Sequence, residues 1–180
     1  LGRVGLSSTD AASTLAPETT FLATDRGTRL LTGAATWRTA GPHTLTATDL
    51  DAPTIVGEGT LVVAPASPAQ VVLSGPVSGI AGVDSAYDAI VQDEFGNTSP
   101  GLTPLTVTLT GSPTAIVNAT NLGGAEPGTS QLGGTSPDDG LVTFVVRETV
   151  TGTVGVCISG STFVTAAACV ELAIAPAPAD

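Results

Sequence analysis

The only two cysteines, Cys157 and Cys169, are the residues whose type and spacing most directly indicate chemistry. Each lies in a segment in which apolar and polar residues alternate, as they do in half-buried β-strands. Val156 and Ile158 face inward beside Cys157, and Val170 faces inward beside Cys169, so both sulfurs are expected to point outward. Neighbouring antiparallel strands would bring the sulfurs together on one face, where a cross-strand disulfide is feasible. Such a bridge requires an oxidising compartment, and the alternative is a pair of free thiols.

Calcium binding by carboxylates is a second candidate chemistry. Asp49 and Asp93 follow apolar strands, and Asp138 and Asp139 form the closest acidic cluster, beside Gly140. Calcium requires six or more oxygen ligands from converging loops, and the chain has no dense run of alternating Asp residues. Aspartates at such positions also accept backbone hydrogen bonds in turns. We therefore expect turn capping at these positions, with calcium as the alternative and no other cofactor.

The sequence gives no support for catalysis, and we expect the chain not to be an enzyme. His43 is the only histidine and is expected to be solvated at the start of a strand. Two cysteines and one distant histidine do not make a zinc set. No nucleophile elbow, phosphate-binding loop or metal motif is present. Trp37 and Tyr87 are expected in a core or on a sheet face rather than as a platform for sugars.

Charge in this chain is sparse and one-sided. Sixteen acidic residues stand against five Arg and no Lys, which gives a formal net charge of −11. Nucleic acids and anionic membrane surfaces are polyanions, so we expect neither as a partner. No apolar run reaches the length of a membrane-spanning helix, so direct membrane insertion is not expected. The chain opens at Leu1 without a Met or a signal peptide, and we expect it to be a piece of a longer product.

The elements that must position these residues are expected to be β-strands. Hydrophobic residues make up 42% and aromatic residues only 3%, so the core would consist of Val, Leu, Ile and Ala. Apolar and polar residues alternate at 44–48, 106–110, 142–146, 154–158 and 170–174. Turn-forming residues separate these segments. We predict an all-β fold of tandem two-sheet sandwiches.

Proline-containing segments mark the domain organisation. Residues 64–69 carry two prolines among small residues, as in a short and stiff linker, and a related segment closes the chain. Residues 29–65 and 141–176 share one order of strands and turns, but too few residues precede Arg29 for two further strands. We predict a partial sandwich at 1–65, a linker at 66–69, a complete sandwich at 70–176 with a Gly-rich loop inserted at 121–140, and a tail at 177–180.

Four runs of the sequence form a familiar set: SSTD at 7–10, TAGPHTLTATD at 39–49, GIAG at 79–82 and IVQDEFGN at 90–97. Together they resemble the bacterial immunoglobulin-like repeats of long surface proteins and invasin-like adhesins. The resemblance covers most of residues 3–110 and is weaker after that. It implies immunoglobulin-like sandwiches, the first incomplete at its N-terminal side, in an extracellular or cell-surface protein.

These features favour a structural role as a rigid spacer or fibre-building unit of an exported surface or filament protein. The partners would be neighbouring repeats, or identical subunits that add a strand to the open edges of the partial sandwich. The alternative is an adhesin module that binds a receptor or a glycan through its end loops, among them 121–140. A domain that accompanies a catalytic module is a third hypothesis.

Overall fold

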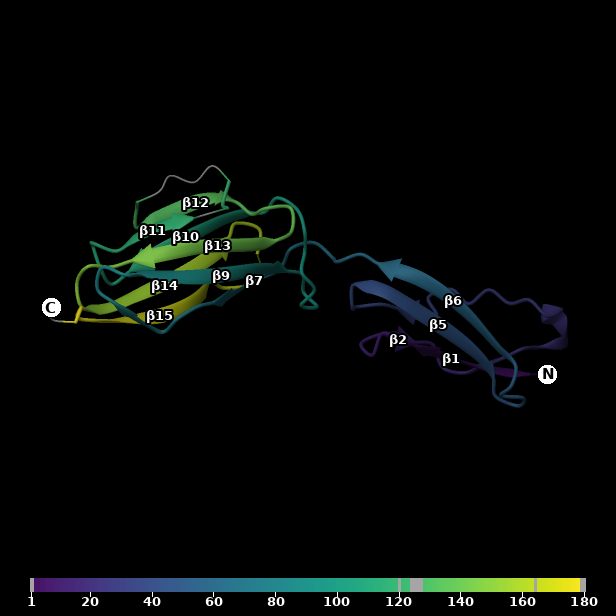
Figure 1. Cartoon of the computed structure of the whole chain (residues 1–180). Coiled ribbons are helices and arrows are strands. Elements are labelled where there is room, and N and C mark those ends of the chain that lie inside the picture. Colours follow the sequence, from purple (N-terminus) through teal and green to yellow (C-terminus); the bar gives the residue numbers. More distant parts are fainter. Residues whose placement is uncertain (1, 120, 124–127, 164, 179–180) are drawn as a thin grey trace. The chain divides into compact units, whose positions relative to one another are not determined.

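The computed structural model describes residues 2–119, 121–123, 128–163 and 165–178. The prediction of an all-β fold is confirmed, since the only helical element in these residues is the 3₁₀ turn η1 (Ala23–Asp25). Within these residues, no helix has the length and apolar character needed to cross a membrane. Contacts divide the chain into two compact units, unit 1 (Leu1–Pro65) and unit 2 (Ala66–Asp180) (Figure 1).

Unit 1 contains one main antiparallel sheet with the strand order β3-β1-β5-β6. A separate two-stranded ladder joins β2 to β4. Strand β5 starts at Gly41, whose φ of 121° is readily adopted only by glycine. The alternation predicted at 44–48 lies within β5. The strands are β1 (Arg3–Ser8), β2 (Thr14–Leu15), β3 (Thr19–Thr20), β4 (Ala35–Thr36), β5 (Gly41–Asp49) and β6 (Val56–Val63).

Unit 2 is a sandwich of a five-stranded sheet, β12-β10-β14-β15-β8, and a four-stranded sheet, β11-β13-β9-β7. All pairs are antiparallel except β15 with β8. The chain passes from one sheet to the other between β7 and β8, where the Tyr87 hydroxyl donates to the Pro76 carbonyl at 2.8 Å. The strands are β7 (Gln70–Ser74), β8 (Ser78–Ile80), β9 (Asp84–Gln92), β10 (Pro104–Thr110), β11 (Ile116–Ala119), β12 (Gln131–Thr135), β13 (Leu141–Arg147), β14 (Gly152–Gly160) and β15 (Ala168–Ala175).

The core of unit 2 lies between the two sheets and is mainly aliphatic. The inward faces predicted for 106–110, 142–146 and 154–158 are buried, and so are Leu172 and Ile174 of the last strand. Two fully buried aromatic side chains, Tyr87 and Phe144, stack with their ring centroids 5.5 Å apart. Alternation with a period of two thus places one row of side chains of each strand in the core.

The main sheet of unit 1 repeats the five-stranded sheet of unit 2. Adding 111 to the residue numbers of the β5-β6 ladder gives the β14-β15 ladder, from Gly41 opposite Val63 to Gly152 opposite Ile174. Strand β1 lies beside β5 as β10 lies beside β14. The short strands β3 and β12 occupy the next position outward. The two sheets therefore share both strand order and register.

The two units differ in how well this sheet is covered. The buried apolar residues of the described chain all lie in unit 2, between Val71 and Ile174. Leu45 and Leu61 of unit 1 are only half-buried, whereas their counterparts Val156 and Leu172 are fully buried. The described part of unit 1 has no counterpart of β7, β8 or β9. Its sheet thus lacks part of the layer that covers the equivalent sheet of unit 2.

Candidate functional site

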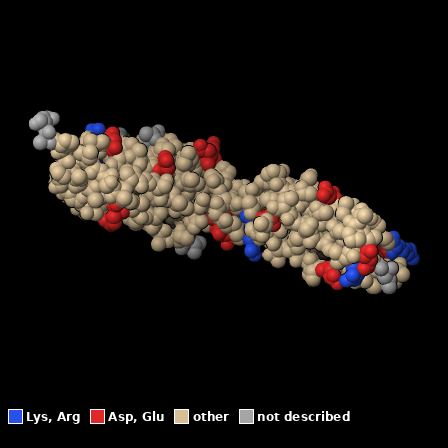
Figure 2. All heavy atoms as spheres, turned by 60° about the horizontal axis from the view of Figure 1, so that its bottom comes forward, with Lys and Arg blue, Asp and Glu red and all other residues tan. Residues whose placement is uncertain are grey.

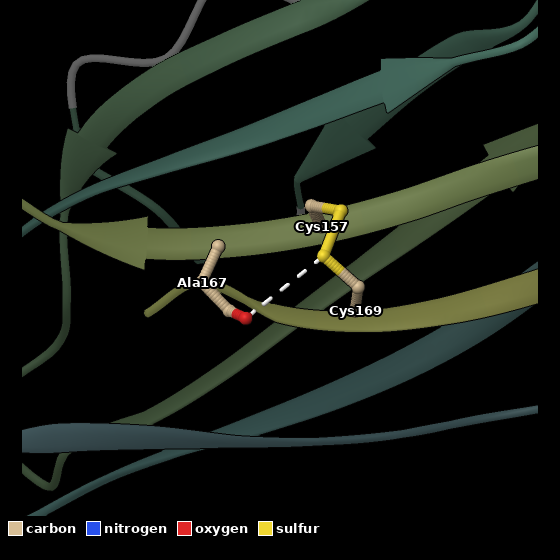
Figure 3. Close-up of a disulfide and its surroundings, with 3 residues drawn as sticks. All are labelled: Cys157, Ala167 and Cys169. Carbon is tan, nitrogen blue, oxygen red and sulfur yellow. Dashed lines mark hydrogen bonds between the residues drawn. A yellow bond between two sulfur atoms is a disulfide. The ribbon is translucent and has the colours of Figure 1, made fainter. Parts of the chain in front are cut away.

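A disulfide joins Cys157 of β14 to Cys169 of β15, the pair indicated by the sequence (Figure 3). The two residues lie directly opposite each other in the ladder, with their Cα atoms 4.1 Å apart. Their neighbours Val156 and Ile158 are buried in the core, whereas Cys169 is exposed. The bridge therefore lies on the outer face of the sheet, and it closes a hairpin with a sequence separation of 12 residues.

Unit 1 carries Thr46 and Glu58 at the positions that correspond to the two cysteines. The two residues pair across β5 and β6, and the Thr46 hydroxyl donates to the Glu58 carboxylate at 3.5 Å. A polar contact on the outer face of unit 1 thus occupies the place of the covalent link in unit 2.

Replacing both residues, Thr46→Cys with Glu58→Cys, should create a second disulfide. Because it would also close a loop of 12 residues, we expect it to stabilise unit 1 by about 3 kcal/mol. Urea unfolding followed by the fluorescence of Trp37, the only tryptophan, reports on unit 1. The reduced form of the same variant is the control. Free thiols that persist in oxidising buffer would contradict the shared register.

Asp93 is a fully buried carboxylate at the end of β9. One oxygen accepts bonds from the backbone N–H groups of Phe95 and Asn97, both at 2.9 Å. The other accepts from the Asn97 side chain at 2.8 Å and from the Ala66 N–H at 2.9 Å. Four N–H donors thus surround the carboxylate. It closes its own turn and also holds the first residue of unit 2, which lies 27 positions earlier in the chain.

The segment predicted as a linker, 66–69, is hydrogen-bonded to unit 2. The Ala66 carbonyl accepts from the Ser99 hydroxyl at 2.9 Å, while its N–H donates to Asp93. The Ala69 N–H donates to the Gln92 carbonyl at 2.8 Å. These bonds fix both ends of the segment. The acceptor of one of them, the Asp93 carboxylate, is a buried charge.

The pKa of Asp93 reflects two opposing effects. Burial raises it, because a buried carboxylate loses its hydration. The bonds from Asn97, Ala66 and Phe95 favour the charged form and outweigh burial, so the pKa lies below its ordinary value. Asp93 is therefore ionised at neutral pH, the state in which it accepts all four bonds.

Each unit has a further carboxylate that accepts hydrogen bonds from a pair of backbone N–H groups, and the two pairs are at equivalent positions. In unit 1, Asp10 accepts from the N–H groups of Arg38 and Thr39, at 2.9 and 3.1 Å. In unit 2, the counterparts of these two residues donate instead to Glu148, at 2.6 and 2.9 Å. Asp10 and Glu148 are both buried. Each unit thus uses a buried carboxylate from a different position for the same task.

Glu148 differs from Asp10 in how its oxygens are used. The Thr114 hydroxyl, at 2.6 Å, and the N–H groups of Thr149 and Val150 all donate to the same oxygen, Oε1. The other oxygen, Oε2, is buried without a hydrogen-bond partner in the described protein. Burial raises the pKa of Glu148, but bonds from Ser112, Thr114, Val150 and Thr149 leave it lower than usual.

Acidification should destabilise unit 1 through Asp10. Bonds from the Arg38 N–H first, and then from Thr39 and Ala12, hold its pKa far below the ordinary value against the opposing effect of burial. A depressed pKa gives stability above the unfolded pKa of about 4, and this stability is lost as the pH falls from there toward the folded pKa. Asp10→Asn should flatten this acid slope in urea unfolding followed at Trp37. Asp139→Asn in unit 2 is the control, and an unchanged slope in the Asp10 variant would rule out this role.

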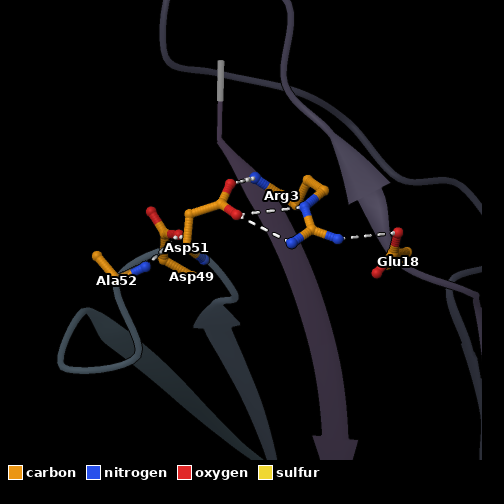
Figure 4. A network of polar contacts seen from close by, with 5 residues as sticks. All are labelled: Arg3, Glu18, Asp49, Asp51 and Ala52. Atoms are coloured by element: carbon orange, nitrogen blue, oxygen red, sulfur yellow. Dashed lines mark hydrogen bonds and ion pairs between the residues drawn. The ribbon is translucent and has the colours of Figure 1, made fainter.

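The other calcium candidates lie in turns or, for Asp49, at the strand end next to one. Asp49 accepts bonds from the N–H groups of Asp51 and Ala52 at 2.8 and 3.0 Å (Figure 4). Asp51 in turn pairs with Arg3 at 2.9 Å, and Arg3 also reaches Glu18 at 3.6 Å. This ion-pair network links the β5-β6 turn to β1 and to Glu18, the residue before β3, on the exposed surface of unit 1.

Asp138 and Asp139 are exposed in the turn before β13. The Asp139 carboxylate accepts from the Leu141 N–H at 3.0 Å, and the Asp138 carbonyl accepts from the Gly101 N–H at 2.9 Å. Across the described residues, no three His, Cys, Asp or Glu side chains form a group that could hold a metal ion.

The prediction of a loop over 121–140 is wrong for residues 131–135. Residues 131–135 form β12, which pairs with β10, and Gly123 forms a bridge with Thr135. Leu122 and Leu132 are buried in the core, which is the physical reason that this Gly-rich stretch is ordered as a strand. These two leucines were the available sequence signal. Residues 124–127 lie outside the described part.

His43 and Trp37 pack against each other in unit 1, and Tyr87 packs in the core of unit 2. His43, expected to be solvated, is instead half-buried against Trp37, with ring centroids 5.8 Å apart. One of its ring nitrogens lies 2.8 Å from the Thr39 carbonyl and the other 3.4 Å from the Thr9 hydroxyl. Tyr87 is in the core of unit 2, as predicted.

No protein-family model and no curated protein sequence matches the chain. Among solved structures, domains 1–6 of the surface layer protein SbsC align over 98% of the chain with a TM-score of 0.46 and 16% identity. The Escherichia coli adhesin FdeC aligns over 97%, with 0.44 and 15%, and a β-glucuronidase of glycoside hydrolase family 2 over 99%, with 0.48 and 18%. The chain spans 20% of the SbsC structure, 54% of that of FdeC and 18% of the glucuronidase. At this level of likeness, the activities of these proteins do not transfer to the chain.

Proposed function

We propose that the chain is a structural segment of an exported surface or filament protein, in which immunoglobulin-like units repeat and act as spacers that withstand tension. In this role no residue is catalytic. The observation that carries the proposal is the recurrence of one sheet, with the same strand order and register, in both units. Repetition of a single module along a chain is the usual design of extended spacers.

Two features of unit 2 and the charge of the whole chain support a mechanical role outside the cell. Its exposed disulfide requires an oxidising compartment. Buried carboxylates hold the loops at both ends of the sandwich. On the face shown, Asp and Glu side chains lie as separate spots with a few Arg between them, and most of the surface is uncharged (Figure 2). The net charge of −11 opposes self-association.

The strand arrangement of unit 2 also suits a tensile load. Strand β8 lies near the amino end of the unit, while β15 is its last strand, and the two run parallel. Force applied at the two ends therefore pulls these strands past each other along their length. The bonds from Ala81 N–H to the Ala175 carbonyl at 2.9 Å and from Ala173 N–H to the Val77 carbonyl at 3.0 Å would be loaded together.

Single-molecule stretching of the chain within a polyprotein tests this proposal. Unit 2 should resist extension and then unfold in one discrete step. The disulfide hides about 12 residues, so Cys157→Ser with Cys169→Ser should lengthen that step by about 4 nm, which identifies unit 2 in the traces. Ala81→Pro removes one loaded N–H and should lower the unfolding force. Extension of unit 2 without measurable resistance would overturn the spacer proposal.

A further inference from the structure

The open side of unit 1 is an interaction surface whose partner can be deduced from unit 2. We propose that unit 1 accepts a β-strand segment with the pattern of β7–β9, supplied by polypeptide outside residues 1–180. Its occupation would turn the partial sandwich into a complete one. This inference goes beyond the spacer role, which unit 2 can perform by itself.

The first argument is what β7 and β9 contribute to unit 2. They supply the core residues Val71, Tyr87, Ala89 and Val91, all at most 7% exposed. These side chains lie over the sheet that is equivalent to the main sheet of unit 1. In the described part of unit 1, the corresponding layer consists of the ladder of β2 and β4, with two residue pairs. Strand β13, by contrast, pairs with β11 on one side and along its whole length with β9 on the other.

The second argument is the edge of the main sheet. In unit 2, β8 adds to β15 through the Ala173 N–H and the Ala175 carbonyl. The counterparts of these residues in unit 1 are Val62 and Ala64, at the end of β6. Strand β6 pairs with β5 on one side, and the described structure assigns it no second neighbour.

Strand β6 also lacks the usual features that protect an edge strand. It is eight residues long, it contains neither Lys nor Pro, and Glu58 is its only charge. Its Val56 and Val62 side chains are 57% and 80% exposed. An edge of this length and composition readily accepts a further strand.

The third argument concerns the source of the segment. One copy of the chain has two sheets that need strands of this kind but only one set, β7–β9, which is already paired in unit 2. Exchange between copies would fill one unit by emptying another, with no net gain in buried surface. Two copies would also bring together chains that each carry a net charge of −11. The segment must therefore come from other polypeptide.

The chain itself provides a defined probe. Because Val4 of β1 occupies the place of Leu105 of β10, a second copy of residues 69–101 fused before Leu1 would lead into β1 as the original leads into β10. Fusion supplies the segment at high effective concentration. The control is the same fusion in which the grafted copy alone carries Ala89→Asp and Val91→Asp.

Hydrogen exchange of the Val62 amide is the decisive measurement. We expect at least about tenfold slower exchange in the intact fusion than in the control, since strand pairing protects edge amides. The unmodified chain should remain a 17.6 kDa monomer by light scattering. Equal exchange rates in the two fusions would overturn the proposal. The proposal would also be overturned if the unmodified chain formed a dimer whose Val62 amide exchanged as slowly as in the intact fusion. A second copy of the chain would then be the occupant.

Discussion

Removing the disulfide, by Cys157→Ala with Cys169→Ala, is expected to lower the free energy of unfolding of unit 2 by about 3 kcal/mol. The bridge closes a loop of 12 residues, and an open loop restores conformational freedom mainly to the unfolded chain. The folded ladder should persist, because six further residue pairs join β14 to β15. Urea unfolding followed at Tyr87, the only tyrosine, measures the change.

Unit 1 supplies an internal control for this experiment. Its transition, followed at Trp37, should not move, because both cysteines belong to unit 2. Reduction of the unmodified protein should reproduce the shift seen in the variant. If the Tyr87 transition stays in place in both cases, the disulfide has no stabilising role in the sandwich.

The fold class and most of the core of unit 2 could be predicted from the sequence, because each depends on a local pattern. Strict alternation at 106–110 and 142–146 is enough to place one face of each strand inward. The disulfide followed from the same pattern, since the inward residues beside each cysteine fix the direction of its sulfur. Local periodicity thus determined both the strands and the covalent link between them.

What could not be predicted depends on contacts between distant residues. Asp10 lies in a run noted in the sequence, but its donors Arg38 and Thr39 come 28 and 29 positions later. No local spacing connects them. Strand β12 was missed for a related reason. Its glycines resemble a loop, and only the burial of Leu132 against the sheet, a tertiary effect, orders it as a strand.

Asp49 and Asp93 illustrate the same limit within one residue type. Both follow an apolar strand, and turn capping was the expected role of each. Asp49 accepts from residues two and three positions later, within its own turn. Asp93 closes its turn and also binds Ala66, across 27 positions, in full burial. The sequence alone did not distinguish a carboxylate that only caps a turn from a buried carboxylate that also binds a distant segment.

Asp93→Ala is expected to destabilise unit 2 by about 4 kcal/mol, because bonds to a buried charge are strong and their loss leaves buried N–H groups without an acceptor. The matched control is Asp139→Ala, which removes one bond at an exposed turn and should cost less than about 1 kcal/mol. Urea unfolding followed at Tyr87 compares the two variants. Hydrogen exchange then locates the effect, since the Ala66 amide loses its acceptor and should exchange much faster. If both variants lost the same free energy of unfolding, Asp93 would only cap its turn. A large loss of free energy of unfolding in Asp93→Ala, together with fast exchange of the Ala66 amide, would instead show that one buried carboxylate fixes the entry of the chain into unit 2.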